Sequence, residues 1–228
     1  LDDEQESSNI VDRRGERGGG GGMRLPIGGG KLGIGGMLVV GVIALLLGQN
    51  PLAMIGMVEG AGVGGPGVGQ PQEAVARSAP PALNGTHDRF IAKVLGSTER
   101  TWDAVFRDQL GKPYPQPKLN LFEGGVNSGC GQADSGMGPF YCPADQQVYL
   151  DASFFDDLSR RFGAPGDFAA AYVIAHEVGH HIQTVIGISA EVQKARRASG
   201  PAQGNALSVR QELQADCFAG VWAHHNRD

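Results

Sequence analysis

The chain has 228 residues and a formal net charge of −5 at pH 7. An acidic balance with no basic patch argues against a nucleic-acid partner. Of its 37 glycines, 21 lie within residues 1–70, so the Gly-rich character belongs to the N-terminal third, and residues 83–228 have the length of one ordinary domain.

The first two segments predict a membrane anchor. Residues 1–31 are rich in Gly and Arg and are expected to be a flexible cytoplasmic segment. Residues 32–48 carry no charged or strongly polar side chain and would span about 26 Å as a helix, within the transmembrane range. Positive charges precede this run, and the next one is Arg77, so the positive-inside rule predicts a single pass through the cytoplasmic membrane, with the N-terminus inside and the rest of the chain extracytoplasmic. A buried core helix and a cleaved signal sequence starting at Met23 are the alternatives.

After the anchor we expect a tether and then one folded domain. Residues 49–82 are rich in Gly and Pro and cannot bury enough apolar surface to order themselves. Within residues 83–228, apolar side chains at helical spacing over 87–110 predict two helices, with a break at residues 96–98. Residues 118–122 and 147–150 read as short strands, and residues 151–162 as a further helix.

Two cysteines lie in a Gly-rich loop. Cys130 and Cys142 are expected to form a disulfide, because the predicted location outside the membrane is oxidising. A structural zinc site is the alternative, although neither cysteine belongs to a C-x-x-C pair. Cys217 is left over and is expected to be a small buried residue.

Residues 176–180 read His-Glu-Val-Gly-His, within a predicted helix that begins near Asp167. Residues four apart lie on one helical face, so His176 and His180 can aim their rings at one zinc ion. Glu177 stands beside that point without ligating it, as a general base for water must. The pattern predicts a zinc hydrolase, most simply a peptidase. Hydrogen-bonded core histidines are the alternative.

A third zinc ligand is predicted downstream. Glu212 and Asp216 are four residues apart, so they share a helical face; Glu212 would ligate the metal, and Asp216 would accept the ring N–H of a bound histidine. Ser208 with Gln211 fits a capping box and predicts the start of this helix. A solvated acidic helix is the alternative.

The side chains on the neighbouring surface of that helix are small. Ala215, Ala219 and Gly220 are expected to let it approach the first helix closely. Possible substitute ligands for Glu212 are His181, His224 and His225. Of these, His181 points about 100° away from His180 on a regular helix.

Segments along nearly the whole chain, except about residues 56–82, resemble the bacterial membrane-anchored "putative neutral zinc metallopeptidase" family. The matching segments are residues 8–9, 12–15, 137–143, 147–151, 154–156, 175–181 and 210–222. The resemblance implies a zinc-dependent peptidase whose helix pair is related to that of the gluzincin peptidases, with a glutamate as third ligand. It implies a peptide or protein substrate without specifying one. Family members continue past the position of Asp228, so the chain is expected to be part of a longer protein.

The predicted fold class is α+β and mainly helical: a zincin-like metallopeptidase domain with a small sheet, after one transmembrane helix. In H-E-x-x-H peptidases a strand edge commonly lines the cleft, and by that analogy Val148, Tyr149 and Leu150 are predicted to hold substrate; a plain core strand is an equal alternative. We expect one catalytic Zn²⁺. The competing functions are a non-catalytic membrane protein with a structural zinc closed by Cys217 or His181, and a zinc hydrolase of another substrate class.

Overall fold

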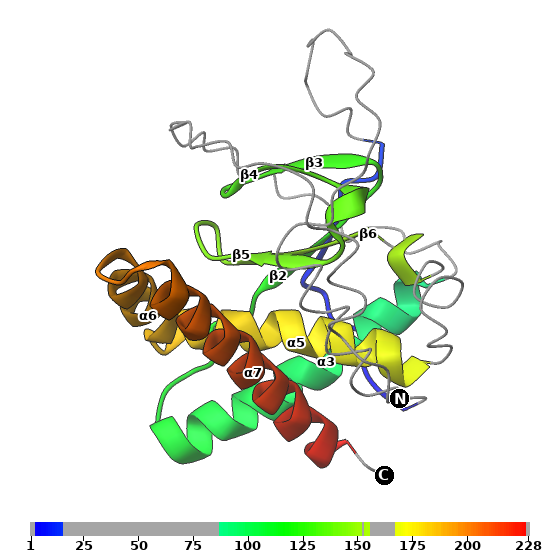
Figure 1. Ribbon diagram of the computed structural model, residues 1–228. Coiled ribbons are helices and arrows are strands. Elements are labelled where there is room, and N and C mark those ends of the chain that lie inside the picture. The colour runs from blue at the N-terminus through cyan, green and yellow to red at the C-terminus, as the bar shows by residue number, and fades with distance from the viewer. Residues whose placement is uncertain (1–2, 16–86, 152, 156–166, 227–228) are drawn as a thin grey trace, which may run out of the picture.

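The computed structural model of the chain describes residues 3–15, 87–151, 153–155 and 167–226 (Figure 1). Helices form one layer and the strands lie on one side of it (Figure 1). This arrangement confirms the α+β class with mainly helices and a small sheet. The helices are α3 (Asp88–Val105), which continues into the π-helical turn η1 (Phe106–Leu110), the short 3₁₀ turn η2 (Ser135–Met137), α5 (Asp167–Val185), α6 (Ile188–Arg197) and α7 (Pro201–His225).

Four strands form the main sheet, in the order β1-β2-β6-β5. The strands β1 (Ile10–Asp12), β2 (Lys118–Phe122) and β6 (Gln147–Asp151) are parallel, and β5 (Phe140–Cys142) runs antiparallel to β6 at the edge. A separate hairpin consists of β3 (Gly125–Ser128) and β4 (Gly131–Asp134).

The core lies between the sheet and α5. Successive strand side chains point to opposite faces, and β6 follows this rule. Val148 and Leu150 are buried with α5 residues such as Ile174 and Val178, whereas Tyr149 is buried in a second cluster on the hairpin side. Besides β5 and β6, α5 packs against α3, α6 and α7, so it is the central element of the domain.

The two helices predicted over 87–110 are one continuous helix, so the predicted break is wrong. Gly96 lies inside α3, where an added Cβ would come within 2.3 Å of the Gln5 carbonyl oxygen and 3.2 Å of the Ser7 backbone nitrogen. This glycine makes room for a crossing chain segment instead of ending a helix. The helix predicted over residues 151–162 is described only in part. Asp151 ends β6, residues 153–155 are helical, and residues 156–162 lie outside the described residues.

The crossing segment is the N-terminus of the chain, which the sequence predicts to be part of a separate cytoplasmic segment. β1 pairs in parallel with β2, with Ile10 opposite Leu119, and the Ser7 N–H donates to the Ala92 carbonyl oxygen at 2.9 Å. Arg14 pairs with the fully buried Asp88 at 2.7 Å. The domain predicted at 83–228 therefore also includes residues 3–15.

This placement constrains the predicted membrane topology. The proposed span, residues 32–48, and the tether, residues 49–82, lie outside the described residues. A single crossing by residues 32–48 would leave residues 3–15 and 87–226 on opposite faces of a membrane, which does not fit the pairing of β1 with β2. Within the parts of the chain that the structure describes, no helix is long and apolar enough to cross a membrane.

Candidate metal centre

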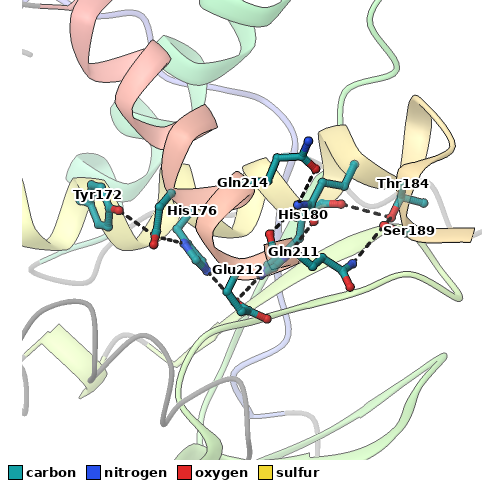
Figure 2. A network of polar contacts seen from close by, with 10 residues as sticks. Tyr172, His176, His180, Thr184, Ser189, Gln211, Glu212 and Gln214 are labelled. Atoms are coloured by element: carbon teal, nitrogen blue, oxygen red, sulfur yellow. Dashed lines mark hydrogen bonds and ion pairs between the residues drawn. The ribbon is translucent and has the colours of Figure 1, made fainter. Parts of the chain in front are cut away.

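The H-E-x-x-H residues lie in the middle of α5, on the part of the helix that the sheet and α7 cover. His176 and Glu177 are almost fully buried, with 2% and 4% of their surfaces exposed. α7 crosses α5 and brings Glu212 to the two histidines (Figure 2). That helix begins at Pro201, with Gly200 as N-cap, and not at Ser208 as predicted: the Ser208 hydroxyl donates to the Gly204 carbonyl oxygen inside the helix.

Close contact between the two helices depends on small residues at the crossing. A Cβ on Gly179 would lie 2.8 Å from the Ala215 carbonyl oxygen, so only glycine fits without displacing α7. Ala215 and Ala219 are fully buried, as the small-residue prediction requires. Gly220 does not take part, because it is exposed and an added Cβ would meet nothing within 4 Å.

Three potential ligand atoms converge at the crossing. One atom each from His176, His180 and Glu212 lies within 4.8 Å of the others. The Glu212 Oε2 atom is 3.3 Å from His176 Nε2 and 3.2 Å from His180 Nε2. Buried His176 Nε2 nevertheless has no hydrogen-bond partner. Two imidazole nitrogens and a carboxylate oxygen are a donor set that zinc prefers, and a metal would satisfy the unpaired nitrogen, so these residues fit the ion.

His176 is oriented by a carboxylate. Its Nδ1 atom lies 2.8 Å from Asp216 Oδ1, and the Tyr172 hydroxyl donates to the same oxygen at 2.7 Å. An ionised carboxylate only accepts, so the His176 ring carries a proton on Nδ1. Nε2, which faces Glu212, is then the ring atom that can bind a metal once the ring is neutral.

His180 is oriented by an amide, which sequence reasoning missed. Gln183 is fully buried, and its Nε2 donates to the Gln211 carbonyl oxygen at 2.6 Å and to Gln214 Oε1 at 3.1 Å. Its Oε1 therefore faces His180 Nδ1, at 2.9 Å, and accepts the ring proton. The sequence carries one indication of this contact: Gln183 lies three residues after His180, so the two side chains are neighbours on the same helix.

The charges of the three candidate ligands are strongly coupled in the metal-free chain. Burial alone would lower the pKa of His176, but its contacts with the Asp216 and Glu212 carboxylates raise it to about 10. The pKa of His180 is also raised, against burial, by the Glu212 carboxylate. Burial would raise the pKa of Glu212, yet its contacts with the His176 and His180 rings lower it to about 2. The site holds positive charge beside its carboxylates, which is the charge a metal cation would replace.

Glu177 lies beside these groups but is not one of the three candidate ligands. Burial raises its pKa, against the opposing effects of the neighbouring histidines and of the Tyr141 backbone. A cavity of about 200 Å³ opens over Glu177, His176, His180 and Glu212. The β5 segment forms another wall of this cavity, through Pro139, Phe140, Tyr141 and Pro143.

The strand predicted to hold substrate is not an edge strand of the sheet. Val148, Tyr149 and Leu150 lie in β6, which pairs with β2 on one side and β5 on the other, so its backbone has no free edge. The edge strand beside the cavity is β5. Tyr149 has a structural role, because its ring stacks on Phe140 at 4.8 Å and its hydroxyl donates to Asp145 at 2.7 Å.

The suggested substitute ligands point elsewhere. His181 Nε2 lies 2.5 Å from the Pro115 carbonyl oxygen, and its Nδ1 lies 3.2 Å from the Tyr141 hydroxyl. His224 and His225 lie exposed at the end of α7. Cys217 is exposed and not buried as predicted. Among the described residues, no fourth His, Cys, Asp or Glu joins His176, His180 and Glu212.

The remaining cysteines are paired. Cys130 and Cys142 form a disulfide that ties the end of β5 to the turn before β4. Cys142 is fully buried against Tyr149 and Phe122, on the side of β6 away from α5. The bridge therefore belongs to the support of the cavity wall and not to the candidate metal centre.

Known proteins resemble the chain over most of its length. The family model described as "Putative neutral zinc metallopeptidase" matches residues 2–228. The chain is 44% identical over 224 residues to the "Uncharacterized protein YpfJ" of Escherichia coli (strain K12), covering 96% of this chain and 73% of that protein. It is 46% identical over 140 residues to the "Uncharacterized protein Rv2575" of Mycobacterium tuberculosis (strain ATCC 25618 / H37Rv), covering 60% and 45% of the respective chains. No solved structure matches the chain significantly. The chain belongs to the "putative neutral zinc metallopeptidase" family.

Proposed function

We propose that the protein is a zinc-dependent peptidase in which His176, His180 and Glu212 hold one Zn²⁺ and Glu177 is the general base. The observation that carries this proposal is the convergence of three ligand atoms within 4.8 Å, beside a buried carboxylate and open to one cavity. Peptide hydrolysis needs this combination of a metal site with an accessible side and a base within reach of water.

Zinc bound at this site supplies Lewis-acid chemistry, which lowers the pKa of water and polarises a carbonyl oxygen. Glu177 accepts a proton from the attacking water and transfers it to the leaving amine. Burial suits Glu177 to both steps, because a raised pKa makes the carboxylic acid easier to form and brings it closer to the working pH. Asp216 and Gln183 hold the two histidines in the tautomer that presents Nε2.

A purely structural zinc site has less support. Structural zinc is closed by four protein ligands, whereas three converge here among the described residues and a cavity adjoins them. The cavity is bounded by an edge strand, which suits an extended peptide better than a compact small molecule. A peptide or protein is therefore the proposed substrate class.

The test compares two glutamate variants of the full chain. Zinc-loaded wild type, Glu177→Gln and Glu191→Gln are incubated with a pool of synthetic dodecapeptides, and products are identified by mass spectrometry. Glu191 lies exposed on α6, outside the cavity, and is the matched control. We expect Glu177→Gln to bind zinc as wild type does and to lose about 10²–10⁴-fold in kcat, with Glu191→Gln unchanged. Equal turnover by wild type and Glu177→Gln would refute the proposed role of Glu177.

A further inference from the structure

The cavity over the candidate metal centre is lined by two chemically different groups of residues besides the H-E-x-x-H residues and Glu212. On the β5 side the lining is apolar or aromatic, and it consists of Pro139, Phe140, Tyr141 and Pro143. On the helical side the lining is polar and uncharged, and it consists of Thr184, Ser189 and Gln211. We call these three residues the polar subsite. A ligand that fills the cavity therefore meets hydrogen-bonding groups on one side only.

The polar subsite lies where three helices meet, next to two of the candidate ligands. Thr184 follows His180 by four residues on α5, so the two side chains share a helical face. Gln211 directly precedes Glu212 on α7, and Ser189 lies in the first turn of α6. One helical turn rises about 5.4 Å, a distance that the side chain of a peptide residue spans. With the scissile carbonyl at the metal centre, a side chain beside the scissile bond reaches the polar subsite.

Hydrogen bonds within the polar subsite orient the amide of Gln211. The Thr184 hydroxyl donates to the His180 carbonyl oxygen at 3.1 Å, and the hydroxyl oxygens of Thr184 and Ser189 lie 3.1 Å apart. Gln211 Nε2 donates to the Ser189 hydroxyl oxygen at 3.5 Å, so the amide oxygen of Gln211 points away from Ser189 (Figure 2). Among the described residues, no donor is bonded to this oxygen. It is therefore an acceptor that a ligand in the cavity can use.

We infer that the polar subsite selects peptides with a neutral, hydrogen-bond-donating side chain beside the scissile bond, and that Gln211 determines this specificity. The inference rests on the proposed function and adds a substrate preference to it. An apolar side chain would cover the Gln211 oxygen without supplying a donor, which costs binding free energy. An ionised side chain would lose its water without gaining an opposite charge, because the three groups of the subsite are uncharged. The adjacent Glu212 carboxylate already contacts both histidine rings.

Peptides that differ in one side chain test this inference, and binding is measured apart from catalysis. The parent is the dodecapeptide that the zinc-loaded chain cleaves fastest, and each residue flanking the cleaved bond is replaced in turn by Asn, Leu, Asp or Lys. Without cleavage, the parent is the dodecapeptide that the metal-free chain binds most tightly, and every position is scanned. Asn, Leu and Asp have similar shapes and differ in hydrogen bonding and charge.

Fluorescence anisotropy gives Kd for the metal-free full chain and three variants. Gln211→Met removes the amide with little change in side-chain length, and Ser189→Ala removes the group that orients the amide from a different helix. Gln203→Met is the matched control, because Gln203 lies exposed on the same helix as Gln211 and outside the cavity.

At one position we expect Asn to bind wild type and Gln203→Met about tenfold more tightly than Leu, Asp or Lys does. In Gln211→Met, Leu should bind as tightly as Asn, and in Ser189→Ala the preference for Asn should shrink to less than about threefold. The inference is overturned if either variant keeps the full preference, if wild type prefers Asn at no position, or if no peptide binds. The expected binding pattern without cleavage by the zinc-loaded chain would instead refute the peptidase function and leave the polar subsite standing.

Discussion

The two histidines of the metal centre are supported in different ways. His176 donates to the carboxylate of Asp216, which also accepts from Tyr172, whereas His180 donates to the neutral amide of Gln183. Asp216 adds negative charge near the ligands and comes from the opposite helix. Gln183 adds no charge, comes from the same helix as His180, and is bonded to two groups of α7. Asp216 therefore tunes the electrostatics of the site, and Gln183 fixes the packing of α5 against α7.

Removing either histidine should abolish this difference, because both are proposed zinc ligands. We expect His176→Ala and His180→Ala to weaken zinc binding by well over the 10–100-fold that loss of a ligand's hydrogen-bond partner costs. His225→Ala, at the exposed end of α7, is the matched control and should bind zinc normally. Zinc affinity is measured by competition with a chromophoric chelator. A ligand variant with wild-type affinity would remove that histidine from the site.

Substitutions of the two supports should separate affinity from stability. Asp216→Asn keeps the shape but removes the charge, so we expect zinc affinity to fall about 10–100-fold. Gln183→Leu leaves His180 Nδ1, the Gln211 carbonyl and Gln214 without this partner, so we expect the metal-free chain to lose about 1–3 kcal/mol for each buried group left unsatisfied. Urea unfolding and zinc titration are measured on both variants. The two supports do not have these separate roles if Asp216→Asn is the less stable chain and Gln183→Leu the weaker zinc binder.

Moving the helices apart should affect both histidines together. A Cβ at Gly179 would lie 2.8 Å from a backbone oxygen of α7, which cannot give way as a side chain can. We expect Gly179→Ala to cost about 1–3 kcal/mol of stability, typical of overpacking, and to weaken zinc binding by drawing Glu212 away from both rings. Gly204→Ala, where an added Cβ meets nothing, is the control. Unchanged stability of Gly179→Ala would show that the crossing is looser than described.

A further expected effect is a pH dependence carried by His176. Its folded pKa of about 10 exceeds the ordinary 6.5, so its charge stabilises the metal-free chain fully below pH 6.5, and this stability is lost as pH rises through 10. Zinc needs the neutral ring, so its affinity should rise over the same window. Without the Asp216 carboxylate the pKa of His176 is less raised, and Asp216→Asn should show a shallower slope. Thermal unfolding of metal-free and zinc-loaded chains between pH 6.5 and 10 measures this, and parallel slopes for wild type and Asp216→Asn would contradict it.

The candidate ligands could be predicted from sequence because their geometry is local. His176 and His180 share a helical turn, and Glu212 and Asp216 share another, so spacing alone aligns each pair. The role of Gln183 could not be predicted in this way, because the hydrogen bonds that fix its amide are made with α7, far along the chain. The carboxylate of Asp216, by contrast, was recognisable because a charged residue on a helix beside H-E-x-x-H suggests a partner.

Long-range placement could not be predicted in the same way. β1 has only three residues, and its partner β2 lies more than a hundred residues further along, so no local pattern indicated that the N-terminus joins the sheet. Gly96 resembled a helix break because the segment that passes over it was assigned elsewhere. For the substrate edge, alternation identified β6 as a strand, but only the pairing of β5 shows which strand is at the edge.

Zinc stoichiometry of the full chain, measured with Glu212→Gln and the exposed-surface variant Glu191→Gln in parallel, tests the central claim most directly. We expect one zinc per chain for wild type and Glu191→Gln, and a large loss for Glu212→Gln, because that carboxylate joins the two histidines at the helix crossing. A folded wild-type chain that binds no zinc, or a Glu212→Gln variant that binds it as tightly as wild type, would contradict the account.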